Sequence, residues 1–193
     1  MTLWRTKAAL VGVAAVLGLA ACSDDSSRPS QPMAGQPTRA ASANTMQYVE
    51  AMANGNLFEI QSSQLALQKS RDARVRRFAQ RMIDEHTRMQ SELSTAVRTT
   101  GPSLTVPTAL DNRHSSAIQD LQGVTGREFD RMYLTAQINA HNEALVVNQN
   151  YAQIGDDPAL KQLAANNVPV IQEHLTMAQQ IAGPARVSRR TTQ

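Results

Sequence analysis

The sequence predicts an all-α protein, a four-helix bundle with a short extra helix in the connection between the second and third long helices. Between residues 44 and 183, apolar side chains recur every three or four positions, which is the period of an amphipathic helix. No run of alternating β-branched residues interrupts this pattern, and aromatic residues make up only 4% of the chain. Breaks that contain Gly or Pro divide the stretch into four long segments, which favours a bundle.

The first long helix is expected over residues 45–69, and the second between a cap at Ser70 or Asp72 and the break at Gly101-Pro102. One side of the first helix carries Val49, Met52, Asn56, Ile60, Ser63 and Leu67. The corresponding side of the second carries Val75, Phe78, Ala79, Met82, His86, Met89, Leu93 and Ala96. Each helix can therefore bury one face against its neighbours.

A short helix over residues 110–121 and a third long helix that reaches about residue 154 follow. Thr125 and Glu128 have the spacing of a capping box, which would start the third long helix after a break at residues 123–126. Its interior side is expected to carry Phe129, Tyr133, Ala136, Ala140, Ala144, Val147 and Tyr151, with Ile138 and Leu145 widening the face.

The start of the fourth long helix is indicated by Gly155, the N-cap candidate Asp157 and the first-turn proline Pro158. Its interior residues follow steps of four and three: Leu160, Ala164, Asn167, Ile171, His174, Ala178 and Ile181. Pro169 falls inside this helix and is expected to kink it, because one backbone hydrogen bond is lost there.

The chain begins with the three parts of an export signal and ends that signal at its only cysteine. Arg5 and Lys7 form a basic start, residues 8–19 are apolar, and small residues precede Cys22. The apolar run is too short for a stable membrane span. The segment resembles a bacterial lipoprotein signal, so we expect residues 1–21 to be removed and Cys22 to be acylated. The protein would then be anchored in the cell envelope on the periplasmic side, and Ser23 favours the outer membrane.

Composition divides the rest of the chain into a tether, one domain and a tail. Residues 22–43 contain almost no large apolar side chains and are expected to be a disordered tether. Residues 44–183 have the size of one domain, and residues 184–193 form a short basic tail expected to be disordered. Without the signal, 17 basic side chains stand against 16 acidic ones, and no basic stripe is interleaved with aromatics. We therefore expect no nucleic-acid partner.

The positions of the histidines are the strongest indication of a chemical site in this sequence. His86, His141 and His174 lie on or beside the apolar sides of three different long helices, whereas His114 lies in the short helix among polar residues. Glu59 on the first helix is next to the same interior. A bundle that brings these side chains to one level would offer a carboxylate and three imidazoles to a zinc, iron, manganese or copper ion.

Motifs spread along the helical region resemble one bacterial envelope family. The motifs in order are Gly55, Glu59-Ile60, Leu65-Ala66, Val75, Phe78-Ala79, Met82, His86, Phe129-Asp130, Tyr133, Gln137, His141, Pro169 and His174-Leu175. This pattern is similar to that of the domain of unknown function DUF4142 and covers about residues 47–182. The resemblance implies a ferritin-like four-helix bundle in an exported or lipid-anchored protein, and it implies no settled activity.

Two departures limit the chemistry that this resemblance implies. Glu85 precedes His86, where the family commonly has Asp. None of the seven glutamates is followed three positions later by histidine, so the Glu-x-x-His pair of di-iron ferritin-like enzymes is missing. A di-iron oxidase centre is therefore not expected, and no catalytic residue is assigned.

Two hypotheses of different class follow. In the first, the protein is a lipid-anchored, non-enzymatic envelope protein with a structural, interaction or stress-related role toward another envelope protein, and the histidines belong to a polar network. In the second, Glu59, His86, His141 and His174 hold a single transition-metal ion in the bundle core. The side chains that could orient these ligands from behind are Asp84, Asp130, Tyr133 and Gln137.

Overall fold

The computed structural model describes residues 41–101 and 103–183, which lie within one compact unit. Over this part of the chain the protein is all-helical, with five helices and no strand, so the predicted all-α class is confirmed. The signal at residues 1–21, Cys22, most of the tether and the tail at residues 184–193 lie outside the described residues. No described helix is both long and apolar enough to cross a membrane.

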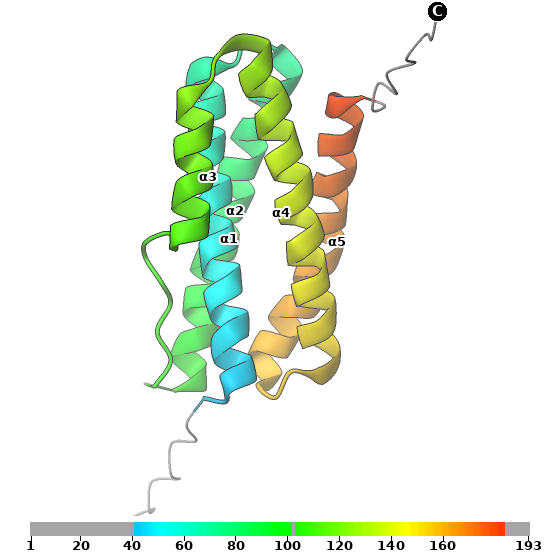
Figure 1. Cartoon of the computed structure of the whole chain (residues 1–193). Helices are drawn as coiled ribbons and strands as arrows, with labels where there is room; N and C mark the ends of the chain where they lie inside the picture. Colours follow the sequence, from blue (N-terminus) through cyan, green and yellow to red (C-terminus); the bar gives the residue numbers. More distant parts are fainter. Residues whose placement is uncertain (1–40, 102, 184–193) are drawn as a thin grey trace, which may run out of the picture. The chain divides into compact units, whose positions relative to one another are not determined.

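Four of the helices are long and run alongside one another, and the remaining one, α3 (Asn112–Gly123), is short (Figure 1). The five helices are α1 (Ala43–Lys69), α2 (Ala73–Thr100), α3 (Asn112–Gly123), α4 (Gly126–Ile154) and α5 (Pro158–Ala182). α1 packs against α2 and α4, and α5 packs against the same two helices. α2 and α4 run opposite to α1 and α5, because α3 and its flanking loops return the chain to the end where α2 began (Figure 1).

Local hydrogen bonds at the helix starts follow the sequence closely, with one exception. The side chains of Asp72, Asp111 and Asp157 accept hydrogen bonds from backbone N–H groups in the first turns of α2, α3 and α5. The capping box at the start of α4 was predicted wrongly, because Thr125 makes no side-chain cap bond. Glu128 instead pairs with Arg131 on the exposed helix surface.

The interior contains two apolar clusters at different levels of the helices. The first includes Tyr48, Val49, Met52, Met89, Leu93, Tyr151, Leu160 and Ile171. The second includes Ala66, Val75, Phe78, Met82, Phe129, Tyr133, Leu134 and Ala178. Burial of each large side chain contributes about 1.5–3 kcal/mol to folding, so these clusters supply most of the driving force.

A buried polar layer separates the two clusters on all four long helices. On α2, for example, His86 lies between Met82 of the second cluster and Met89 of the first. The members of this polar layer are Asn56, Glu59, Ser62, Ser63, His86, Gln137, His141 and His174. Because buried polar groups need hydrogen bonds or charges to offset lost hydration, the layer is the part of the interior that requires a chemical explanation.

The predicted interior faces of α2 and α5 are nearly correct, while those of α1 and α4 need correction. On α1, Glu59 is buried and Ile60 is only partly buried. On α4, Gln137, His141 and Asn148 are buried, whereas the predicted alanines are only partly so. Hydrogen bonds offset the burial of Asn148, which donates to the carbonyl of Ala144 and accepts from the hydroxyl of Tyr48.

Candidate metal centre

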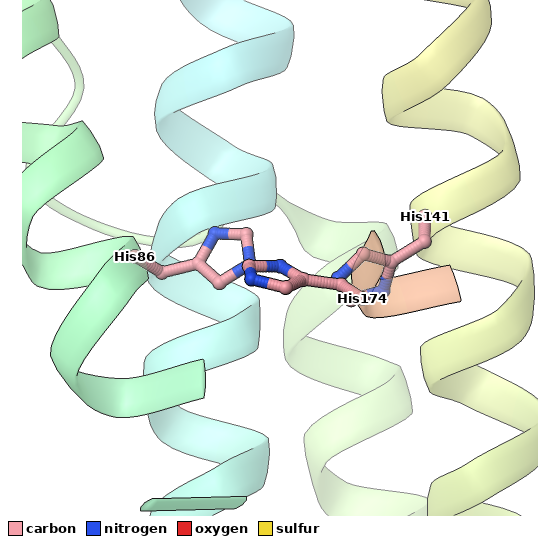
Figure 2. Close-up of side chains that lie close together, drawn as sticks. All are labelled: His86, His141 and His174. Atoms are coloured by element: carbon pink, nitrogen blue, oxygen red, sulfur yellow. The ribbon is translucent and has the colours of Figure 1, made fainter. Parts of the chain in front are cut away.

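Three helices bring three imidazoles to one point inside the polar layer. His86 comes from α2, His141 from α4 and His174 from α5, and the three rings point toward one another (Figure 2). One ring nitrogen of each lies within 4.8 Å of one nitrogen of both others. The side chains are 4%, 1% and 0% exposed, so water screens this cluster little. The histidines are therefore an internal group and not a surface patch.

Hydrogen bonds decide which nitrogen of His141 and of His86 carries a proton. His141 Nδ1 lies 2.8 Å from the carbonyl oxygen of Gln137, which can only accept, so Nδ1 is the protonated nitrogen. His86 Nδ1 lies 3.0 Å from Oδ1 of Asn56, whose amide nitrogen is already engaged with Gln90 at 3.1 Å. Nδ1 therefore donates in both rings, and Nε2 keeps its lone pair.

His174 is oriented the other way round by a carboxylate. Its Nε2 lies 2.5 Å from Oε2 of Glu85, and Arg81 contacts the other oxygen of that carboxylate at 2.8 Å. Although partial burial opposes it, the bonds from His174 and Arg81 hold the pKa of Glu85 below its usual value. The ionised carboxylate accepts from Nε2–H, so the lone pair of His174 is on Nδ1.

All three imidazoles are neutral near pH 7, because burial lowers the pKa of each. The pKa of His141 falls to about 4, that of His86 lies well below its ordinary value, and that of His174 is lowered despite its bond to Glu85. The nitrogens with lone pairs are His86 Nε2, His141 Nε2 and His174 Nδ1, and none has a hydrogen-bond partner among the described residues. Such lone pairs are what a metal ion requires of histidine.

The spacing suits a first-row transition metal. Three atoms that are mutually within 4.8 Å share a point about 2.8 Å or less from each, and typical Zn–N bonds are about 2.0–2.1 Å. Small side-chain rotations would close the difference. Asn56, the Gln137 carbonyl and Glu85 each hold the second nitrogen of one ring, which is the usual way proteins orient metal-binding histidines.

Glu59 is beside this group but outside it. Its Oε1 lies 3.6 Å from Nδ1 of His141, the nitrogen that donates to the Gln137 carbonyl. Burial raises the pKa of Glu59 to about 8, with the Gln137 side chain opposing the shift, so the carboxyl group is largely protonated at pH 7. Neither carboxyl oxygen has a hydrogen-bond partner among the described residues. The structure thus brings together three of the four predicted ligands.

Three of the four side chains that were predicted to orient the ligands have other surroundings. Asp84 is exposed and accepts from Gln80. Tyr133 bonds to Ser63 at 2.8 Å, and Asp130 has one buried oxygen with no partner in the described part of the chain. In the described part of the chain, none of the three makes a hydrogen bond to a histidine ring.

Of these four residues, only Gln137 contacts a histidine within the described ranges, and the carboxylate that contacts His174 belongs to Glu85, which was not among them. Gln137 contacts His141 through its main chain, while its side chain donates to Ser62. Glu85 was left unassigned by the sequence pattern. Its signal is the Glu-His pair that occurs on both α2 and α5, at Glu85-His86 and Glu173-His174.

Fold and site together define an all-helical protein with a buried three-histidine cluster. The model of the family "Domain of unknown function (DUF4142)" matches residues 29–181, and the chain belongs to this family. A search of the curated proteins finds no match.

Solved structures of the same fold are distant in sequence. A DUF305 fragment from Deinococcus radiodurans is 14% identical, with a TM-score of 0.65, covering 76% of this chain and 100% of that one. A secreted DUF305 protein from Streptomyces coelicolor is 13% identical, with a TM-score of 0.60, covering 72% and 91%. CopM in a Cu(I)-bound form is 19% identical, with a TM-score of 0.58, covering 70% and 93%.

Proposed function

We propose that this protein binds one transition-metal ion, zinc or copper, at His86, His141 and His174. The observation that carries the proposal is the convergence of three neutral, buried imidazoles whose unprotonated nitrogens have no hydrogen-bond partner among the described residues. Three lone pairs directed at one point repel one another, and a bound cation removes that repulsion. A polar network without metal would instead be expected to leave few of these nitrogens unpartnered.

Zinc and copper fit the donors better than manganese or iron. Imidazole nitrogen suits zinc, copper and iron, whereas manganese favours oxygen. Non-haem iron sites typically combine two histidines with a carboxylate, and no carboxylate is among the three converging donors. Solved structures of CopM, which has the same fold, contain Cu(I) and Cu(II), so copper is a reasonable first ion to test. Because the Glu-x-x-His pairs of di-iron centres are missing, the site is proposed to hold a single ion.

The finer architecture and the location belong to the same proposal. The four long helices are assigned as a ferritin-like bundle, with α3 in its long crossover connection and the metal in its core. Acylated Cys22 and the tether at residues 22–43 would hold the bundle at the periplasmic side of the outer membrane. There, without catalysing a reaction, it would store the ion or pass it on to another envelope protein. Loss of the membrane-bound fraction in a Cys22→Ala variant tests the anchor.

Elemental analysis tests the metal assignment. The full chain is purified in detergent without an affinity tag, from cells supplied with iron, zinc, manganese and copper. We expect close to one equivalent of zinc or copper per chain, and its loss in the variant with His86→Ala, His141→Ala and His174→Ala. Absence of metal from the unmodified protein, or an equal metal content in both proteins, would overturn the proposal.

A further inference from the structure

Three of the four long helices supply a nitrogen to the metal point, and α1 supplies no donor to it among the described residues. At this level α1 presents Gly55, Asn56 and Glu59. Asn56 is engaged with His86, and Glu59 lies behind His141 on the side of its protonated nitrogen. An ion held by three imidazoles in tetrahedral geometry has one more position, and α1 is the long helix that lies beside the site without supplying a donor.

A cavity lies on that same side. It has a volume of about 60 Å³ and is bordered by Gly55, Glu59, His86, Met89 and His141. A single water needs only about 10–15 Å³ on this measure, so the space admits a ligand of a few atoms. It also reaches His114 of α3, which is partly exposed, so the cavity extends toward the surface.

Gly55 borders this cavity without filling it. A Cβ atom added at Gly55 would meet nothing within 4 Å, so close helix packing does not require glycine here. Glycine inside a helix costs about 0.5–1 kcal/mol relative to alanine. The space it leaves is bordered by a buried carboxyl group whose two oxygens have no hydrogen-bond partner in the described part of the chain.

We infer that the fourth coordination position of the metal takes a small exogenous ligand, which occupies the cavity between α1, α2 and α4 beside Gly55. This inference rests on the proposed metal site. The ligand class is a small monodentate donor, either water or an anion of the size of azide. Glu59 supplies its polar contact, and the remaining lining is mainly apolar, from residues such as Met52, Ala140, Val147 and Ile171. The site is therefore of the open kind, in contrast to a structural metal site closed by four protein ligands.

Cobalt(II) and azide provide the test. The full chain is freed of metal with a chelator and loaded with Co(II), whose visible absorption depends on its ligands, and azide is then titrated. We expect a saturable spectral change in the unmodified protein and in Gly55→Ala, which adds only a methyl group to free space. Gly55→Leu and Ala140→Leu fill the cavity from opposite helices, and should bind azide about tenfold more weakly or worse at unchanged Co(II) content.

Each outcome separates this inference from the metal site itself. Full Co(II) loading without any response to azide would overturn it, since the fourth coordination position would then be closed to small ligands. An unchanged response in both leucine variants would overturn it as well, because the ligand would bind elsewhere. If no Co(II) binds and elemental analysis finds no other metal, the proposed metal-binding function is contradicted. The inference about the fourth coordination position is then contradicted too, because it depends on the metal site.

Discussion

At the scale of single residues, Glu85 shows how a partly exposed carboxylate can control a buried histidine. It accepts from Nε2 of His174 and is held in turn by Arg81, which also contacts Glu173 at 2.9 Å. This chain of contacts keeps the proton of His174 on Nε2 and leaves the lone pair on Nδ1, which has no hydrogen-bond partner among the described residues. Glu85 therefore orients His174, a proposed ligand, without itself belonging to the group of converging donor atoms.

Glu85→Gln should weaken metal binding about 10- to 100-fold, the range typical for losing such an orienting carboxylate. The amide is a weaker acceptor for Nε2–H and leaves Arg81 with one partner fewer. The measurement is competition between the protein and a chromogenic chelator for zinc or copper.

Glu173→Gln is the matched control for that experiment. Glu173 also precedes a histidine directly and also contacts Arg81, but its side chain is 56% exposed and makes no hydrogen bond to a histidine ring among the described residues. Exposed ion pairs contribute about 0–1 kcal/mol, so the affinity should change by no more than about fivefold. Equal losses in both variants would show that charge near the site, and not orientation of His174, sets the affinity.

At the scale of elements, α1 combines a buried polar segment with a glycine in its interior. Gly55 is followed by Asn56 and Glu59, and this segment lies between the apolar residues that α1 contributes to the two clusters. α1 therefore gives up both helix propensity and apolar burial at one level. Packing of its remaining turns against α2 and α4 keeps it helical there.

Gly55→Ala should raise the free energy of unfolding of the metal-free protein by about 0.5–1 kcal/mol. The reason is that alanine restricts the unfolded chain and its Cβ meets no atom within 4 Å. Urea unfolding followed by circular dichroism measures the difference. A loss of stability would instead mean that the backbone around Gly55 cannot accept a side chain.

At the scale of the whole molecule, the polar layer makes stability depend on pH in two opposite ways. The lowered pKa values of His86, His141 and His174 mean that the unfolded chain takes up protons first as the pH falls below about 6.5. Their contribution to stability is thus complete above that pH and is lost toward pH 4. Glu59, with its pKa raised to about 8, contributes fully below about pH 4.5 and loses its contribution as the pH rises to 8.

In the metal-free protein, stability should therefore fall when the pH is lowered from 6.5 to 5, because three histidines outweigh one glutamate. The slope is at most about 3 kcal/mol per pH unit. Glu59→Gln removes the opposing effect, so the stability of this variant should fall more steeply on acidification. Its free energy of unfolding should exceed that of the unmodified protein most clearly near pH 8. Urea midpoints between pH 5 and 8 measure both trends. A constant midpoint would contradict the burial of these four groups.

The helices and the residues capable of binding a metal could be predicted from local patterns in the sequence. Helical spacing, the caps at Asp72 and Asp157 and the breaks at Gly101 and Gly155 depend on interactions a few residues apart, which a sequence displays directly. The absence of Glu-x-x-His also excluded a di-iron pattern without any structure.

The way in which the three histidines meet depends on how the helices pack against one another in the tertiary structure. Spacing places a side chain on a face of its own helix, but the level at which helices pack depends on contacts between residues far apart in the chain. That register brings Glu85 of α2 to His174 of α5, and it leaves Glu59 behind His141. The free nitrogen of each ring follows from these distant partners, so the geometry of the candidate site could not be derived from local sequence alone.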